Sequence, residues 1–179
     1  MDDANPGQPG TPAVVTHFQE MLMALRPKIP IELIEDDPSL ADFYAFQLHP
    51  LETLPAWLDT NARRMLSEQG LPSQATPYLS FFDAGRASRI STSLPALGLA
   101  IGHDGGGNLL AIDAASGEVV MWDHDNDDAR VFVNRDLPRF ASCLCEVPRG
   151  IHNRQGFLQA VANIDPAAAA KEAFWPSQC

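Results

Sequence analysis

The residues best suited to chemistry lie within one stretch, 101–128, which reads IGHDGGGNLLAIDAASGEVVMWDHDNDD. It contains two histidines, six aspartates and three consecutive glycines. Carboxylates and imidazoles can bind a metal ion, transfer a proton, or form a charged surface for another protein. Each of these three chemistries requires a particular spacing of residues, so the spacing within 101–128 indicates which of them the sequence supports.

A calcium loop is the first hypothesis, because Asp123, Asp125 and Asp127 have the alternating spacing of the first EF-hand ligands. The sixth loop position, however, is Asp128 where glycine is required, and the twelfth is Asn134 where a bidentate glutamate is required. The flanking segments also have the pattern of strands. We therefore expect a solvated acidic hairpin tip, with no bound metal and no cofactor.

An acid–base site is the second hypothesis, because His103 and His124 each neighbour an aspartate. Adjacent residues on a strand point to opposite faces, so His103 cannot pair with Asp104, nor His124 with Asp123, in this simple way. A G-x-S-x-G nucleophile motif is absent. We predict no catalytic residue and no enzyme; a metal-dependent hydrolase that uses these four residues is retained as an alternative.

The glycine run Gly105–Gly107 lies between two apolar segments and has aspartate before it and asparagine after it. A dinucleotide fingerprint would need a further glycine three residues on and a following helix, and the sequence has neither. A turn with several residues at positive φ is the simpler interpretation, because only glycine adopts such angles at little cost.

Negative charge is concentrated in residues 101–136, which contain eight acidic residues and only two arginines. The net charge of −6 there is more than half of the −11 carried by the whole chain. If the strand ends lie on one edge, these acids form a patch that steers a basic protein partner. The predicted contacts are Asp104, Trp122, Asp123, Asp125, Asp127 and Asp128, with the tryptophan as an aromatic anchor.

The same excess of acid disfavours direct binding to nucleic acid or to an anionic membrane, both of which would repel the average surface. No run approaches the 18 apolar residues that a membrane span requires, and the amino terminus lacks the apolar core of a secretory signal. Three cysteines, two of them at the close spacing Cys143 and Cys145, indicate a reducing compartment and ordinary helix content rather than a disulfide or zinc site. We expect a cytoplasmic protein.

The elements that position these residues follow from hydrophobic periodicity and from the breakers between segments. Helices are predicted over 13–26, 39–48 and 54–69, and Thr53 is the expected cap of the third. Three more helices are predicted to begin near 137, 153 and 165. The helix near 137 is expected to be capped by Asn134 or Asp136 and to end at Pro148. Strands are predicted over 78–82, 88–94, 97–101, 108–113, 118–123 and 129–133. The order predicts an α+β domain over 13–179, with five to six antiparallel strands flanked by helices, after a flexible acidic tail over 1–12.

The run LGLAIGHDGGGNLLAID…GEVVMWDHD…VFVNRDLPRFASCL, residues 97–144, resembles the core of the SUKH superfamily of Smi/Knr-like proteins. The positions that carry the resemblance are Gly102, Asp104, Gly107, Asp113, Gly117, Val119, Trp122, His124, Phe140 and Leu144. The resemblance implies a non-enzymatic cytoplasmic immunity protein that neutralises a cognate polymorphic toxin, many of which are nucleases or deaminases. A regulatory adaptor of the Smi/Knr type is the second function that the resemblance implies.

Overall fold

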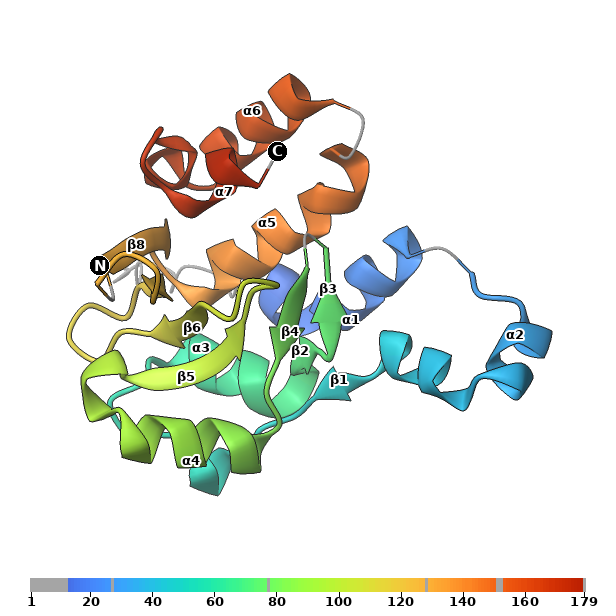
Figure 1. Cartoon of the computed structure of the whole chain (residues 1–179), viewed down its shortest axis with the longest axis horizontal. Coiled ribbons are helices and arrows are strands. Elements are labelled where there is room, and N and C mark those ends of the chain that lie inside the picture. Colours follow the sequence, from blue (N-terminus) through green and yellow to red (C-terminus); the bar gives the residue numbers. More distant parts are fainter. Residues whose placement is uncertain (1–12, 27, 77, 128, 151–152, 179) are drawn as a thin grey trace, which may run out of the picture.

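The computed structural model describes residues 13–26, 28–76, 78–127, 129–150 and 153–178. The predicted tail over 1–12 lies outside these residues. An α+β architecture is confirmed, with helices on both sides of an antiparallel sheet (Figure 1).

Six antiparallel strands form the main sheet in the order β3-β4-β5-β6-β7-β8. They span Gln74–Ala75 (β3), Leu79–Phe81 (β4), Leu99–His103 (β5), Leu109–Ile112 (β6), Val119–Asp123 (β7) and Ala129–Asn134 (β8). A separate pair joins β1 (Phe46–Gln47) to β2 (Leu71–Pro72). The spatial order follows the chain order, so β5 to β8 form a meander whose turns alternate between the two ends of the strands.

The two faces of the sheet bury different amounts of apolar surface because side chains alternate along each strand. In β6, Leu110 and Ile112 belong to the large core, whereas Ala111 between them belongs to a small cluster with Leu97 and Val120. The face that carries Leu110 is therefore the principal interior of the protein.

Helices from both ends of the chain cover that interior face. They are α1 (Ala13–Leu25), α3 (Thr60–Arg64) with its continuation Met65–Gln69, α5 (Leu137–Gly150), α6 (Arg154–Ile164) and α7 (Phe174–Ser177). Trp175 of α7 packs against Phe140 of α5 with ring centroids 5.9 Å apart, and its Nε1 donates to Asn134 Oδ1 at 2.9 Å. This buried hydrogen bond ties the C-terminal helix to the end of β8.

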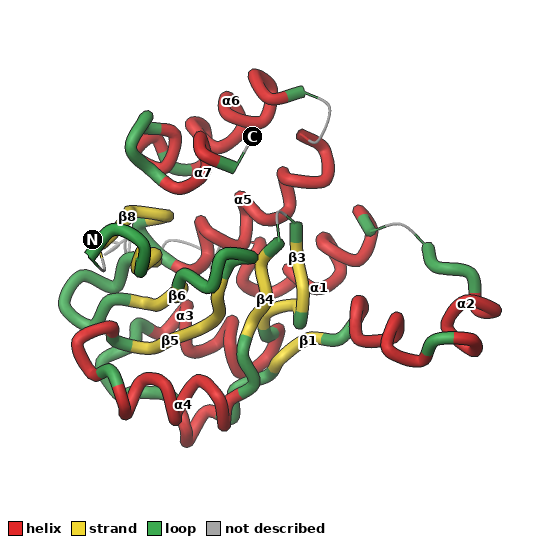
Figure 2. The backbone as a smooth tube through the Cα atoms, in the orientation of Figure 1, coloured by secondary structure: helices red, strands yellow, loops and turns green. Residues whose placement is uncertain are grey.

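The opposite face is covered by α4 (Ala84–Ser93) and the short 3-10 helix Pro95–Leu97 (Figure 1). Between α1 and β1 the chain forms an arm that carries α2 (Ile31–Asp36) and the 3-10 helix Pro38–Tyr44, and the arm projects away from the sheet (Figure 2).

The largest error in the prediction is the strand placed over 88–94, where the structure has helix α4. The β-branched Ile90 and Thr92 favour a strand locally. Asp83, however, caps the segment by accepting a hydrogen bond from the Arg86 amide at 2.9 Å, and Ala87 packs with Phe82 on the sheet. The cap and the tertiary packing outweigh the local preference.

Other elements also differ from the prediction, including the helix expected to begin near 165, which is a short 3-10 helix over Pro166–Ala169. The helix predicted over 54–69 starts at Thr60 with Asp59 as its cap, while Thr53 Oγ1 donates to the Pro50 carbonyl in a separate 3-10 turn. The segment 39–48 is a 3-10 helix that ends at Tyr44, followed by β1. Pro148 lies inside α5 rather than at its end.

The first turns of α5 and α6 show which of the predicted residues cap these helices. Asp136 Oδ1 accepts a hydrogen bond from the Arg139 amide at 2.8 Å, whereas Asn134 is buried beside Trp175. Asn153 caps α6 by accepting from the Gly156 amide at 2.9 Å, as predicted.

Candidate functional site: an acidic edge and an adjoining groove

The meander divides the acidic turns between two opposite edges of the sheet. The turns after β5 and after β7 lie at one edge, and the turn between β6 and β7 lies at the other. We call the first the acidic edge and define it by Asp104, Asp123, Asp125 and Asp127. Asp128, the remaining predicted contact, lies outside the described residues.

The turn 104–108 at the acidic edge is organised by the carboxylate of Asp104. Its Oδ1 accepts hydrogen bonds from the amides of Gly106 and Asn108, each at 2.9 Å, and its Oδ2 accepts from Asn108 Nδ2 at 2.9 Å. Of the three consecutive glycines only Gly107 has a positive φ, of 91°. The prediction that several glycines adopt positive φ is therefore wrong, because the Asp104 carboxylate stabilises the turn instead.

Asn108 joins the two turns of the acidic edge. Its side-chain oxygen accepts from the backbone amide of His124 at 3.2 Å and from His124 Nδ1 at 2.7 Å. Since a carbonyl oxygen only accepts, Nδ1 carries the proton. His124 Nε2 lies 3.3 Å from Asp125 Oδ1. The chain of contacts from Asp104 through Asn108 to His124 holds the two turns in one fixed arrangement.

The second turn presents its carboxylates to solvent. The side chain of Asp125 is 85 % exposed, and Asp127 is exposed with a φ of 52°. Asp123 accepts a hydrogen bond from the Asp125 amide at 3.1 Å. Within the described part of the chain, no lysine or arginine forms an ion pair with an aspartate of the acidic edge.

The opposite edge neutralises its acids. Arg130 forms an ion pair with Glu118 and lies 3.7 Å from Asp113, while Arg139 pairs with Asp136. The Ser116 backbone amide, followed by the Ser116 hydroxyl and other donors, lowers the pKa of Asp113 from its usual value. The eight acids of 101–136 therefore do not form one patch, and the summed charge of −6 overstates the acidic edge.

An apolar groove of about 380 Å³ adjoins the acidic edge. Its lining residues are Ser93, Leu94, Pro95, Ala96, Leu97, Gly107, Leu109, Trp122 and His124. Leu94 at its rim is 47 % exposed, and the buried Nε1 atom of Trp122 has no hydrogen-bond partner among the described residues. The groove is therefore an apolar surface that shares His124 with the acidic edge.

The structure thus brings together the predicted contacts Asp104, Trp122, Asp123, Asp125 and Asp127 at and beside one edge. Sequence reasoning missed Asn108, whose position directly after the glycine run was the only available signal. It also missed Leu94 and Leu97, because the segment before β5 had been predicted as a strand.

The hydrolase alternative requires His103, Asp104, Asp123 and His124 to converge. His103 Nδ1 instead donates to the Asp104 carbonyl at 2.8 Å, and its ring packs against Phe82 with centroids 5.6 Å apart. No group of three or more metal-ligating side chains is found among the residues that the structure covers. The described geometry gives this alternative no support.

The two cysteines that the structure describes offer no exposed nucleophile. Cys143 and Cys145 lie buried in α5, as predicted for ordinary helix residues. Burial, as the main cause, raises the pKa of the Cys143 thiol to about 12, so the thiol remains protonated at neutral pH. None of the helices in the described ranges has the length and apolar character needed to cross a membrane.

The family model of the SUKH-4 immunity protein matches residues 45–179 of the chain. Because the match covers most of the chain, the protein belongs to the SUKH-4 immunity protein family, within the SUKH superfamily. This confirms the resemblance found in residues 97–144. The matched range includes the acidic edge and the groove, whereas α1 and the arm precede it. No curated protein and no solved structure shows a significant match to the chain.

Proposed function

We propose that the protein is a cytoplasmic immunity protein that binds a cognate toxin domain through the acidic edge and the adjoining groove. Membership of the SUKH-4 immunity protein family supports the role against a toxin. The choice of surface depends on one observation: the acids at this edge lack a lysine or arginine partner among the described residues, whereas those at the opposite edge are paired with arginines.

In this proposal lysines and arginines of the toxin contact Asp123, Asp125 and Asp127, with Asp128 as a further contact. Exposed carboxylates without a lysine or arginine partner attract a basic protein over about a Debye length and accelerate encounter at low ionic strength. Asp104 contributes through its turn, because both of its carboxylate oxygens already accept hydrogen bonds.

An apolar side chain of the toxin fills the groove between Leu94 and Trp122. Interfaces derive most of their affinity from a few apolar anchors in desolvated pockets, surrounded by polar contacts that fix orientation. The groove and the acidic edge provide this combination within one surface.

The toxin class that fits this surface best acts on nucleic acid. The catalytic cleft of such an enzyme must attract phosphates, so it carries basic residues that an acidic edge can occupy. Binding of the immunity protein would then exclude the nucleic acid from the cleft.

The test is to co-express this chain with the toxin domain encoded beside its gene and to purify the complex. The proposal predicts a stable complex in which the nucleic-acid cleavage or deamination activity of the toxin is lost. Association measured between about 50 and 200 mM salt should slow as salt increases. A complex whose association rate does not depend on salt would contradict docking through the acidic edge.

A further inference from the structure

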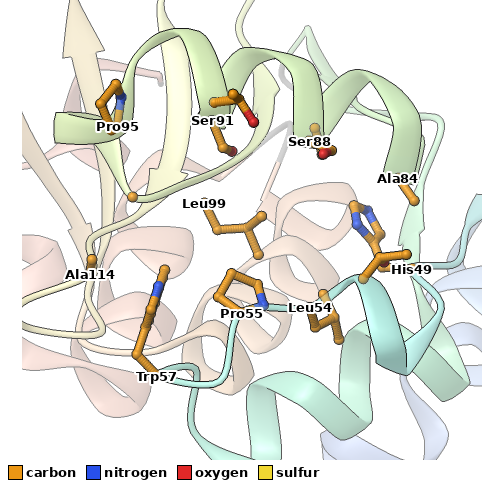
Figure 3. Close-up of a pocket in the computed structure, with 14 residues that line it drawn as sticks. His49, Leu54, Pro55, Trp57, Ala84, Ser88, Ser91, Pro95, Leu99 and Ala114 are labelled. Carbon is orange, nitrogen blue, oxygen red and sulfur yellow. The ribbon is translucent and has the colours of Figure 1, made fainter.

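A second pocket lies between α4 and the segment 49–57, and it is separate from the docking groove except for the shared residue Pro95 (Figure 3). Its volume is about 310 Å³, which is at the lower end of the range for small-molecule sites. None of its fourteen lining residues is an aspartate, glutamate, lysine or arginine. A ligand of this pocket is therefore expected to be small and uncharged.

His49 occupies one end of the pocket, with its ring directed toward α4 (Figure 3). The residue is only 2 % exposed, and Nε2 lies 3.1 Å from the Phe82 carbonyl oxygen. Because that oxygen only accepts, Nε2 carries the proton. Burial, the largest influence, lowers the pKa of His49, so the ring is neutral at pH 7.

The other ring nitrogen, Nδ1, is consequently an acceptor with a free lone pair. No hydrogen bond joins it to any residue that the structure describes. A ligand N–H group that reached Nδ1 would provide this acceptor with a hydrogen bond.

The wall formed by α4 adds two hydroxyl groups. Ala84, Ser88 and Ser91 lie on one face of the helix, because they are spaced four and three residues apart. Ser91 Oγ accepts from the Ala100 amide at 2.9 Å, which leaves its own O–H as a donor. The Ser88 side chain has no hydrogen-bond partner among the described residues.

The opposite wall is mainly apolar. Figure 3 shows Leu54 and Pro55 between His49 and Trp57, which lies toward the other end of the pocket. Trp57 is 43 % exposed, although a tryptophan is a core residue by default. An exposed aromatic ring beside a pocket provides a stacking surface for a planar ligand.

We propose that this pocket binds a small, uncharged, planar heterocycle of the nucleobase or aromatic carboxamide type. An N–H group of the ligand donates to His49 Nδ1, the hydroxyls of Ser88 and Ser91 contact its polar edge, and its ring packs on Pro55 and Trp57. This inference is independent of toxin binding, since it depends on residues outside the acidic edge.

The test uses the full chain labelled with ¹⁵N and three probes, adenine, uracil and nicotinamide, titrated separately. The His49 Nδ1 resonance and the Trp57 indole N–H resonance are followed by NMR. We expect saturable shifts of both signals by at least one probe, with a dissociation constant of about 1 mM or tighter, as is typical of a ligand of about ten heavy atoms.

Ser88→Phe places a ring in the pocket without replacing a buried residue, and it should weaken binding at least about tenfold. Arg89→Phe is the matched control on the same helix, since the exposed Arg89 lines neither this pocket nor the docking groove, and it should bind the probe like the unmodified chain. His49→Phe retains a ring of similar size but removes Nδ1, and should weaken binding to a similar degree. The inference is overturned if no probe shifts the two signals at millimolar concentration, or if the shifts persist unchanged in Ser88→Phe.

Discussion

The two edges of the meander contain similar residues but use them differently. At the edge that carries Asp113, Glu118 and Asp136, arginines from β8 and α5 pair with the carboxylates. At the acidic edge, the outermost carboxylates of Asp125 and Asp127 face solvent. Acids at the first edge stabilise turns and helix starts, whereas Asp125 and Asp127 at the second remain available to a partner.

Hydrogen bonds within the acidic edge sharpen this difference. Asp104 and Asn108 fix the position of the turn that carries His124, so the exposed carboxylates are held in place without an arginine. A surface that is ordered before binding loses less conformational entropy when it binds. The acidic edge therefore combines unneutralised charge with a defined geometry.

The largest expected effect on toxin affinity comes from a substitution in the groove beside the acidic edge. Leu94→Glu should weaken toxin binding by about 30-fold or more, because it places a charge where an apolar anchor would dock. Leu48→Glu is the matched control, since Leu48 is similarly exposed and does not line the groove. Equal losses of affinity in the two variants, measured by calorimetry, would remove the groove from the interface.

Charge at the acidic edge should control the association rate. Asp125→Lys combined with Asp127→Asn should slow association about tenfold at low salt and have less effect at high salt. Asparagine is chosen at position 127 because its φ of 52° suits asparagine better than lysine.

The control for this pair is Glu32→Lys with Asp36→Asn in α2, which changes the net charge equally on the exposed arm. Stopped-flow measurements of both double variants separate local from overall charge. If the arm variant slows association as much as the edge variant, net charge alone sets the rate.

The link between the two turns should contribute to stability. Asn108→Ala removes the acceptor of two hydrogen bonds from His124, and we expect a loss of about 1 kcal/mol in the free energy of unfolding. Thermal and urea denaturation would measure this loss. Toxin association should also slow, because the exposed turn is no longer fixed; an unchanged association rate would show that its order is irrelevant.

The smallest expected effect concerns Asp113 at the opposite edge and the pH dependence of protein stability. The folded state lowers the pKa of Asp113, mainly through the Ser116 amide, so the ionised carboxylate favours folding. This contribution is present above the unfolded pKa of about 4 and is lost as the pH falls through the lower folded value. Asp113→Asn should thus be less stable than the unmodified chain at pH 7, and the difference should shrink below pH 4. A difference that is constant with pH would contradict the role of the charge.

The meander could be predicted from the sequence, because β6 and β7 are short apolar runs joined by a turn with Gly117 at a positive φ of 75°. Helix α4 could not, since its β-branched residues favour a strand and its stability depends on packing against Phe82 and the sheet. The groove was missed for the same reason, because α4 and the 3-10 helix Pro95–Leu97 form one of its walls.

The division of the acids between two edges also could not be predicted from the sequence. Arg130 lies close in sequence to Asp127 but pairs with Glu118 across the strand pair, so proximity along the chain suggests the wrong partner. Asn108 has no sequence signal for its contact with His124, sixteen residues away. Both depend on the register of neighbouring strands.

Hydrogen exchange of the protein alone and in complex with its toxin tests the choice of surface most directly. The proposal predicts that amides of 94–97, 104–108 and 123–127 become protected in the complex, while those of 113–118 exchange as in the unbound protein. Protection confined to 113–118 or to the arm, with exchange at 104–108 and 123–127 unchanged, would contradict it.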